Sequence, residues 1–309
     1  MSDDGPTAGS GVVLVHGIGE SGSTAEQLVQ QWLPALQTGL RTAGADELAD
    51  QLVAGPGRLG VQMAYYADVF APYEAANAMA LATDPDLTEA IGQLTQQWLE
   101  TAVTRSSDPA DRTAAQDALA FGATEESLWD RLRILSDALN DLHFFRPGVV
   151  SAAGFVDHAL REAALYSANA QVKTAVQQRI RAAVTPTTRV VVAHSLGSVA
   201  AYEVLQEIDQ PIVLLTLGSP LGMSTVFYER LTVQPPHVPA CVTAWTNLAD
   251  PDDLIATHLD LAPYFPPAPG RTVQCINHQI DNGADPHDPV RYLEHRQAGA
   301  AVGAALTGP

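Results

Sequence analysis

The apolar positions of this chain of 309 residues form two patterns that alternate along much of its length. Short uninterrupted runs of aliphatic residues, typical of strands buried on both faces of a parallel sheet, predict strands at 12–15, 59–66, 189–193, 212–217, 241–246 and 272–276. Helical periodicity predicts helices at about 25–40, 198–207, 225–230 and 289–306. This alternation predicts an α/β fold, with a mostly parallel sheet flanked by helices.

The strand pattern is interrupted by a long block with helical periodicity that is rich in Ala, Leu, Gln and Glu. Breaks at Asp84-Pro85, Ser107-Asp108-Pro109 and Phe145-Arg146-Pro147-Gly148 divide the block into several helices. We therefore predict a first part of the α/β core at 1–70, a large helical insertion at 71–185, and the second part of the core at 186–309. The insertion is either a cap over the carboxyl edge of the sheet or a packed addition. Phe144 and Phe145 pack inside it or line an acyl pocket, and packing is the simpler interpretation.

Composition excludes several classes of partner. The formal net charge of −19 disfavours binding to nucleic acid and to anionic membrane surfaces, because both would be repelled at long range. Residues 1–10 lack the positive start and apolar core of a secretory signal, and no apolar run is long enough to span a bilayer. We expect a cytoplasmic location, with Cys241 and Cys275 acting as small core residues in a reducing compartment.

The most informative segment is the β-branched run 190–192, which ends abruptly at Ala193-His194-Ser195-Leu196-Gly197 before a helical pattern begins. This arrangement is typical of a nucleophile elbow, where a serine on a sharp strand-to-helix turn exposes its hydroxyl. The turn leaves little room two residues before and two residues after the serine, and Ala193 and Gly197 occupy those positions. The alternative interpretation of Ser195 is a helix N-cap that follows a buried strand.

A serine hydroxyl becomes a good nucleophile when an imidazole removes its proton and a carboxylate fixes the tautomer of that imidazole. Acids follow the predicted strand 241–246 at Asp250, Asp252 and Asp253, and histidines follow the last predicted strand at His278 and His287. Any of these acids could instead cap a turn. No histidine pair has the spacing of a metal site, and a calcium site lacks a further ligand, so we expect no metal and no cofactor. A nucleotide-binding protein is disfavoured because no G-x-G-x-x-G follows the first strand.

Three motifs in order carry a family resemblance: V-H-G-I-G at 15–19, H-S-L-G at 194–197 and L-G-S-P at 217–220. With them the chain resembles a bacterial α/β-hydrolase of the lipase/serine esterase superfamily. The resemblance covers about 11–70 and 186–306 and leaves out the helical insertion. Ala193 departs from the first glycine of the G-x-S-x-G signature, and a methyl group is small enough for that position.

The resemblance implies roles for individual residues. Ser195 would be the nucleophile, and Asp253, the second acid of a W-x-N-x-x-D-P-x-D run that starts at Trp245, would be the acid, with Asp250 as the alternative. His287 is preferred as the base because Tyr292-Leu293 follows it at the start of the last helix, while His278 remains the alternative. The oxyanion hole would be formed by the backbone N–H groups of Ile18 and Leu196.

Further residues near these motifs are expected at the substrate pocket. They are Tyr65 and Asp68, at the end of the second predicted strand, and His16, Gly17 and His194, beside the loops. We expect His16 mainly to order its loop by hydrogen bonding, and we expect Ser219 to be structural. The function expected from the resemblance is hydrolysis of a neutral carboxylic ester, lipid-like esters included, through an acyl-enzyme. The alternatives are a thioesterase, amidase or acyltransferase with the same triad, and a non-catalytic scaffold whose helical insertion binds a partner protein.

Overall fold

The protein is built around one parallel sheet, which is seen in the computed structural model of residues 9–74, 84–125, 127–145 and 155–308. Its seven strands lie in the order β2-β3-β1-β4-β5-β6-β7, and every neighbouring pair is parallel. This arrangement confirms the predicted α/β architecture. The strands are β1 Ser10–Val15, β2 Val53–Ala54, β3 Gly57–Ala64, β4 Val190–His194, β5 Ile212–Leu217, β6 Val242–Ala249 and β7 Cys275–Gln279.

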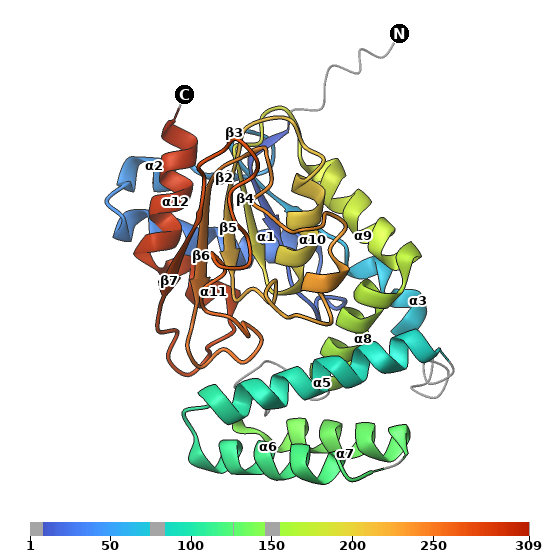
Figure 1. Ribbon diagram of the computed structural model, residues 1–309. Coiled ribbons are helices and arrows are strands. Elements are labelled where there is room, and N and C mark those ends of the chain that lie inside the picture. Colours follow the sequence, from blue (N-terminus) through green and yellow to red (C-terminus); the bar gives the residue numbers. More distant parts are fainter. Residues whose placement is uncertain (1–8, 75–83, 126, 146–154, 309) are drawn as a thin grey trace.

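Alternate residues of the central strands supply two separate hydrophobic cores. In β1, Val13 and Val15 belong to the core shared with helices α9 Ala170–Ala183 and α10 Leu196–Leu205, whereas Val12 and Leu14 belong to the core on the other face. All four are fully buried, as expected for a central strand of a sheet covered on both sides. Figure 1 shows α9 and α10 on one side of the sheet and α12 on the other.

The second face is covered by α1 Ala25–Thr42, α2 Asp46–Gln51, α11 Pro289–Glu294 and α12 Arg296–Thr307. The prediction of a single helix at 289–306 is wrong. The extended backbone of His295 divides this segment into α11 and α12. α12 then packs closely on α1, since a Cβ atom built on Gly299 would lie 2.0 Å from the carbonyl oxygen of Gly39. The short elements α2 and β2 were not predicted, and the predicted helix at 225–230 is a single 3₁₀ turn, Tyr228–Arg230.

All the described secondary structure between β3 and β4 is helical, with turns and short loops between the helices. Its elements are η1 Ala67–Val69, α3 Ala71–Glu74, α5 Pro85–Arg105, α6 Pro109–Gly122, α7 Leu128–Asp141, η2 His143–Phe145, α8 Phe155–Ala168 and α9. Two of the predicted breaks are helix starts, where Asp84 and Asp108 cap the backbone N–H groups and the following proline occupies the first turn. The third break extends into Arg146, Pro147 and Gly148, outside the described residues.

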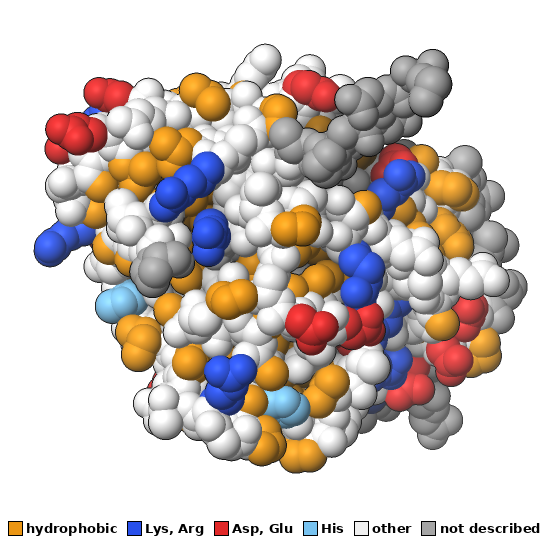
Figure 2. All heavy atoms as spheres, turned by 90° about the horizontal axis from the view of Figure 1, so that it is seen from above, with side chains coloured by type: hydrophobic (Ala, Val, Ile, Leu, Met, Phe, Trp, Pro, Cys, Tyr) orange, Lys and Arg blue, Asp and Glu red, His pale blue; other side chains and the backbone are white. Residues whose placement is uncertain are grey.

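The helices α5, α6 and α7 lie together below the sheet in Figure 1, near α11. This is the carboxyl edge of the sheet, because Arg105 at the end of α5 contacts the loop that follows β6. Phe144 and Phe145 are both buried. Phe145 packs against Trp98 of α5 and Phe144 packs against Phe145, which agrees with the simpler interpretation that they pack the insertion. Figure 2 shows the opposite end of the molecule, where acidic and basic side chains are scattered over a largely uncharged surface.

Within the described residues, none of the helices combines the length and the apolar character that a membrane span requires. Cys241 and Cys275 are buried and unpaired, and the thiol of Cys241 donates to the carbonyl oxygen of Leu205. Both therefore serve as core residues, as predicted.

Candidate active site

Ser195 lies on a sharp turn between β4 and α10. Its φ of 52° and ψ of −132° make it the only non-glycine residue in the described part of the chain with a positive φ. Such a conformation costs roughly 1–3 kcal/mol and persists where the surrounding structure enforces it, often at functional sites. Here the N–H of Ser195 donates to the carbonyl oxygen of Leu217 in β5, at 3.0 Å, which fixes the turn.

Small residues surround this turn because the backbone of the β1 loop passes close to it. A Cβ atom built on Gly197 would lie 2.1 Å from the carbonyl oxygen of His16, and one on Gly17 would lie 2.8 Å from Cβ of Ser195. Any larger residue at either glycine would push the two loops apart. Ala193 is fully buried inside β4, and the sheet accommodates its methyl group.

Ser195, His287 and Asp253 form one chain of hydrogen bonds. The Oγ of Ser195 lies 3.0 Å from Nε2 of His287, and Nδ1 of His287 lies 2.8 Å from Oδ2 of Asp253. All three are buried, with Asp253 fully inaccessible to solvent. Its second oxygen, Oδ1, accepts the backbone N–H groups of Ile255 and Ala256 at 3.0 and 3.3 Å. In this arrangement His287 can donate through Nδ1 and accept the serine proton at Nε2.

The alternative acid and base have other positions. Asp250 accepts the N–H of Asp252 at 2.8 Å and the N–H of Asn282 at 2.5 Å, so it fastens the loop that leads to His287. Burial raises the pKa of Asp250 above its ordinary value. His278 lies within β7, paired in register with Leu248, and not in a loop after the strand. The structure thus brings Asp253 and His287 to Ser195 and leaves the two alternatives out of the hydrogen-bonded chain.

Tyr292, noted in the sequence only as the start of the last helix, contacts the acid directly. Its hydroxyl donates to Oδ2 of Asp253 at 2.7 Å and accepts the N–H of Asp250 at 2.9 Å. Burial and the charge of Asp253 raise the pKa of this hydroxyl well above its usual range, so it remains a donor. The H-x-x-x-x-Y spacing from His287 is the sequence signal that could have suggested this contact.

The L-G-S-P turn after β5 lies under the acid and the base. Gly218 has a φ of 54°, and a Cβ atom built on it would lie 2.6 Å from Oδ2 of Asp253 and 3.1 Å from Nδ1 of His287. Glycine is therefore required here for both conformation and space. Ser219 is structural, as predicted, because its Oγ is buried 2.6 Å from Oγ of Ser198.

The two histidines beside the motifs are buried and hold loops in place. Nδ1–H of His16 donates to the carbonyl oxygen of Gly17 at 2.7 Å, while Nε2 accepts the N–H of Tyr66 at 3.1 Å. Burial lowers the pKa of His16 to about 4. His194 donates through Nε2 to the carbonyl oxygen of His287 at 2.9 Å, and burial together with the nearby His287 lowers the pKa of His194 well below its usual value. Both are therefore neutral at pH 7. His16 orders the loop after β1, and His194 holds the backbone of His287.

Two backbone N–H groups are available beside Ser195. Within the described part of the chain, the N–H groups of Ile18 and Leu196 have no hydrogen-bond partner, and Leu196 is the first residue of α10. The next donor along, the N–H of Gly19, is held by Oε2 of Glu162 in α8 at 3.0 Å. Groups in such a position can bind a developing negative oxygen.

The remaining pocket candidates lie farther along the β3 loop. The hydroxyl of Tyr65 donates to the carbonyl oxygen of Glu20 at 3.3 Å, and the exposed carboxylate of Asp68 forms an ion pair with Arg179 of α9. Tyr65 therefore contacts the loop that follows β1, and Asp68 contacts the insertion. Neither side chain joins the hydrogen-bonded chain of Ser195, His287 and Asp253.

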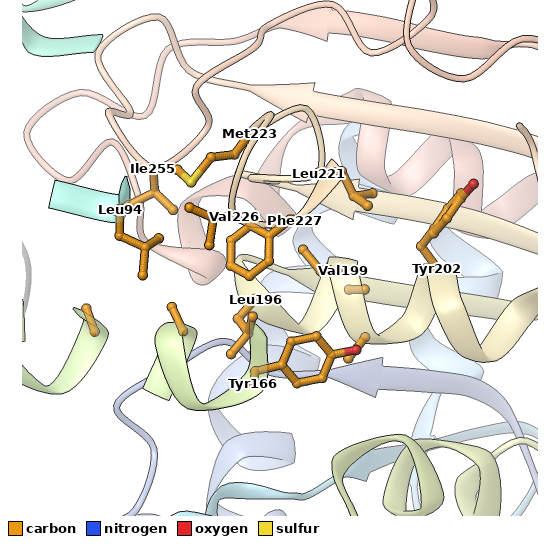
Figure 3. Packing of buried hydrophobic residues seen from close by; sticks show 14 of the residues in the cluster. Leu94, Tyr166, Leu196, Val199, Tyr202, Leu221, Met223, Val226, Phe227 and Ile255 are labelled. Atoms are coloured by element: carbon orange, nitrogen blue, oxygen red, sulfur yellow. The ribbon is translucent and has the colours of Figure 1, made fainter. Parts of the chain in front are cut away.

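One side of the elbow is apolar. Figure 3 shows the side chains of Val226 and Phe227 between Leu196 and Met223. Leu94 of α5 and Ile255, in the loop that follows β6, lie beside them. All of these belong to one buried cluster. Charges and dipoles act more strongly in such a dry environment than they do in water.

Comparison of the chain with family models, with curated proteins and with solved structures finds no match. Among the described residues, no group of three or more His, Cys, Asp or Glu side chains is placed to hold a metal ion. The functional assignment therefore rests on the geometry around Ser195.

Proposed function

We propose that the protein is a serine hydrolase of the α/β-hydrolase type, which cleaves carboxylic esters through an acyl-enzyme. The observation that carries the proposal is the hydrogen-bonded chain from strained Ser195 through His287 to buried Asp253. The three residues follow β4, β7 and β6 respectively, so their order along the chain is serine, acid, histidine, as in α/β-hydrolases.

The reaction would begin when Nε2 of His287 takes the proton of Ser195 as its Oγ attacks the ester carbonyl. The negative oxygen of the tetrahedral intermediate would be bound by the N–H groups of Ile18 and Leu196, and losing one such donor typically costs about 3 kcal/mol. Asp253 would stabilise the imidazolium, which then protonates the leaving alcohol. In deacylation, water would attack the acyl-enzyme carbonyl as Nε2 of His287 takes its proton, and that proton would return to Oγ of Ser195 as the carboxylic acid leaves.

The position of the helical insertion supports its role as a cap over this site. α5 contributes Leu94 to the apolar cluster beside Leu196, and α8 contributes Glu162 to the loop of Ile18. The apolar side chains beside Leu196, among them Val226 and Phe227, favour an uncharged, hydrophobic acyl group. The net charge of −19 disfavours anionic substrates at long range, so a neutral ester, lipid-like esters included, is the proposed substrate.

The experiment that tests this proposal is a panel of neutral esters of increasing acyl length, with thioester and amide counterparts, assayed on the wild type and on Ser195→Ala. We expect ester hydrolysis that is lost in Ser195→Ala and retained in Ser219→Ala, the control for the second serine near the site. A preference for thioesters or amides would change the substrate class. A folded wild type that cleaves nothing in the panel would favour the non-catalytic scaffold.

A further inference from the structure

The last residue of α5, Arg105, extends its guanidinium from the insertion onto the loop that carries Asp253. Nη2 donates to the carbonyl oxygens of Asp250 at 3.0 Å, Pro251 at 2.7 Å and Asp253 at 2.8 Å. Nε also donates to Pro251, at 3.0 Å, and Nη1 donates to Ala256. One side chain thus binds four carbonyl oxygens of a single loop.

This contact depends on the chemistry of arginine. A planar guanidinium carries five donors in a fixed geometry, whereas a lysine ammonium has three donors at one point. Burial lowers the pKa of Arg105, and the negative charges of Asp253, Asp250 and Asp252 act in the opposite direction. Arginine remains protonated even when partly buried, so the contact stays charged.

Asp253 is held both at its backbone, by Arg105, and at its carboxylate, by the N–H groups of the residues that follow it. Its backbone carbonyl is bound by Arg105, while its Oδ1 accepts the N–H groups of Ile255 and Ala256 and its Oδ2 faces His287. Removing the guanidinium would leave four carbonyl groups without this donor and free the loop to shift. A small shift of the carboxylate would misorient His287, and catalysis is sensitive to displacements of that size.

We propose that Arg105 is a positioning residue, through which the helical insertion holds the catalytic acid in line with the base. This inference rests on the proposed function. It makes the insertion a part of the catalytic machinery as well as a cover. Arg105 would act through the loop, because its hydrogen bonds go to backbone carbonyl oxygens there.

A double-mutant cycle of Arg105→Ala with Asp253→Asn tests the proposal on the best ester of the panel. We expect Arg105→Ala to lower kcat about tenfold, with little change in KM, in the wild-type background, and about twofold or less in the Asp253→Asn background, because contacting residues couple. Arg105→Lys should lie between wild type and Arg105→Ala. Arg131→Ala is the matched control: Arg131 also lies in the insertion but bonds to Gln96 of α5.

A second readout does not depend on activity. Amide hydrogen exchange of the segment 250–257 should become faster in Arg105→Ala and stay unchanged in Arg131→Ala, and Arg105→Lys replaces Arg105→Ala in both tests if the alanine variant does not fold. Equal loss of kcat in both backgrounds, or unchanged exchange in the segment, would overturn the positioning role. A wild type without esterase activity would refute the proposed function, and the exchange experiment would still decide whether Arg105 holds the loop.

Discussion

Gly218 lies directly against the carboxylate of Asp253. A Cβ atom at this glycine would come within 2.6 Å of Oδ2, the oxygen that also faces His287. The turn after β5 therefore leaves the space in which the acid and the base meet. This relationship explains why the turn after β5 carries a glycine at position 218.

Gly218→Ala should lower kcat about a hundredfold, because a displacement of catalytic groups by about 1 Å has an effect of that order. An alanine held at the positive φ of position 218 should also lower the free energy of unfolding by roughly 1–2 kcal/mol. Gly270→Ala is the control, since Gly270 has a φ of 75° and no atom within 4 Å of a built Cβ. Steady-state kinetics and urea unfolding separate the effects. Full activity in Gly218→Ala would show that the turn does not constrain Asp253.

Tyr292→Phe removes one donor to Asp253 and keeps the ring in place. We expect kcat to fall and the free energy of unfolding to fall by about 1–3 kcal/mol, because the N–H of Asp250 loses its acceptor. Tyr202→Phe is the matched control, a buried tyrosine whose hydroxyl donates to the carbonyl oxygen of His237. It should lose stability without losing kcat. Parallel losses of kcat in both variants would assign Tyr292 to stability alone.

The two acids should respond differently to amide substitution. Asp253→Asn should lower kcat by about 10⁴, since the amide favours the tautomer of His287 that cannot accept the proton of Ser195. Asp250→Asn keeps an oxygen that can accept one of the two N–H groups, from Asp252 or Asn282, and should affect stability more than kcat. Kinetics with the best ester decide between them. A larger loss of kcat in Asp250→Asn would reverse the assignment.

The buried His16 makes stability depend on pH. Its pKa is lowered from 6.5 to about 4 in the folded protein, so below pH 6.5 the unfolded chain binds a proton that the folded chain does not. Stability should therefore decrease as the pH falls from about 6.5 to about 4, by up to about 1.4 kcal/mol per pH unit from this group. His16→Gln, which can still accept the N–H of Tyr66, should show a shallower decrease in urea unfolding between these pH values. Identical slopes would refute the assignment.

Much of the core was predictable because its signals are local. The apolar runs of β1, β4 and β5 give their positions directly, and the tight approach of His16 to Gly197 requires the glycines that the motifs display. The expected order of serine, acid and histidine along the chain then limited the candidate acids to those after β6 and the candidate bases to the histidines near the last strand. The choice between Asp253 and Asp250 needed the resemblance, because both follow the same strand.

The missed contacts are those that depend on how distant elements pack. Arg105 ends a helix in the insertion and binds a loop far away in the sequence, and no periodicity or spacing encodes such a contact. The contact of Tyr292 with Asp253 was missed for a different reason. Its spacing from His287 was noted only as a mark of the last helix, and the packing of that helix is what brings the buried hydroxyl to Asp253. The break at His295 was missed because no glycine or proline marks it, and the polar residues around it are also compatible with an exposed turn of a helix.

The most direct test of the central claim is covalent labelling with a fluorophosphonate probe, with the modified residue located by mass spectrometry. A serine activated by His287 should be labelled at Ser195 in the wild type and labelled far more slowly in His287→Ala. Ser195→Ala should carry no label. A folded wild type that stays unlabelled, or one labelled at another serine, would contradict the account.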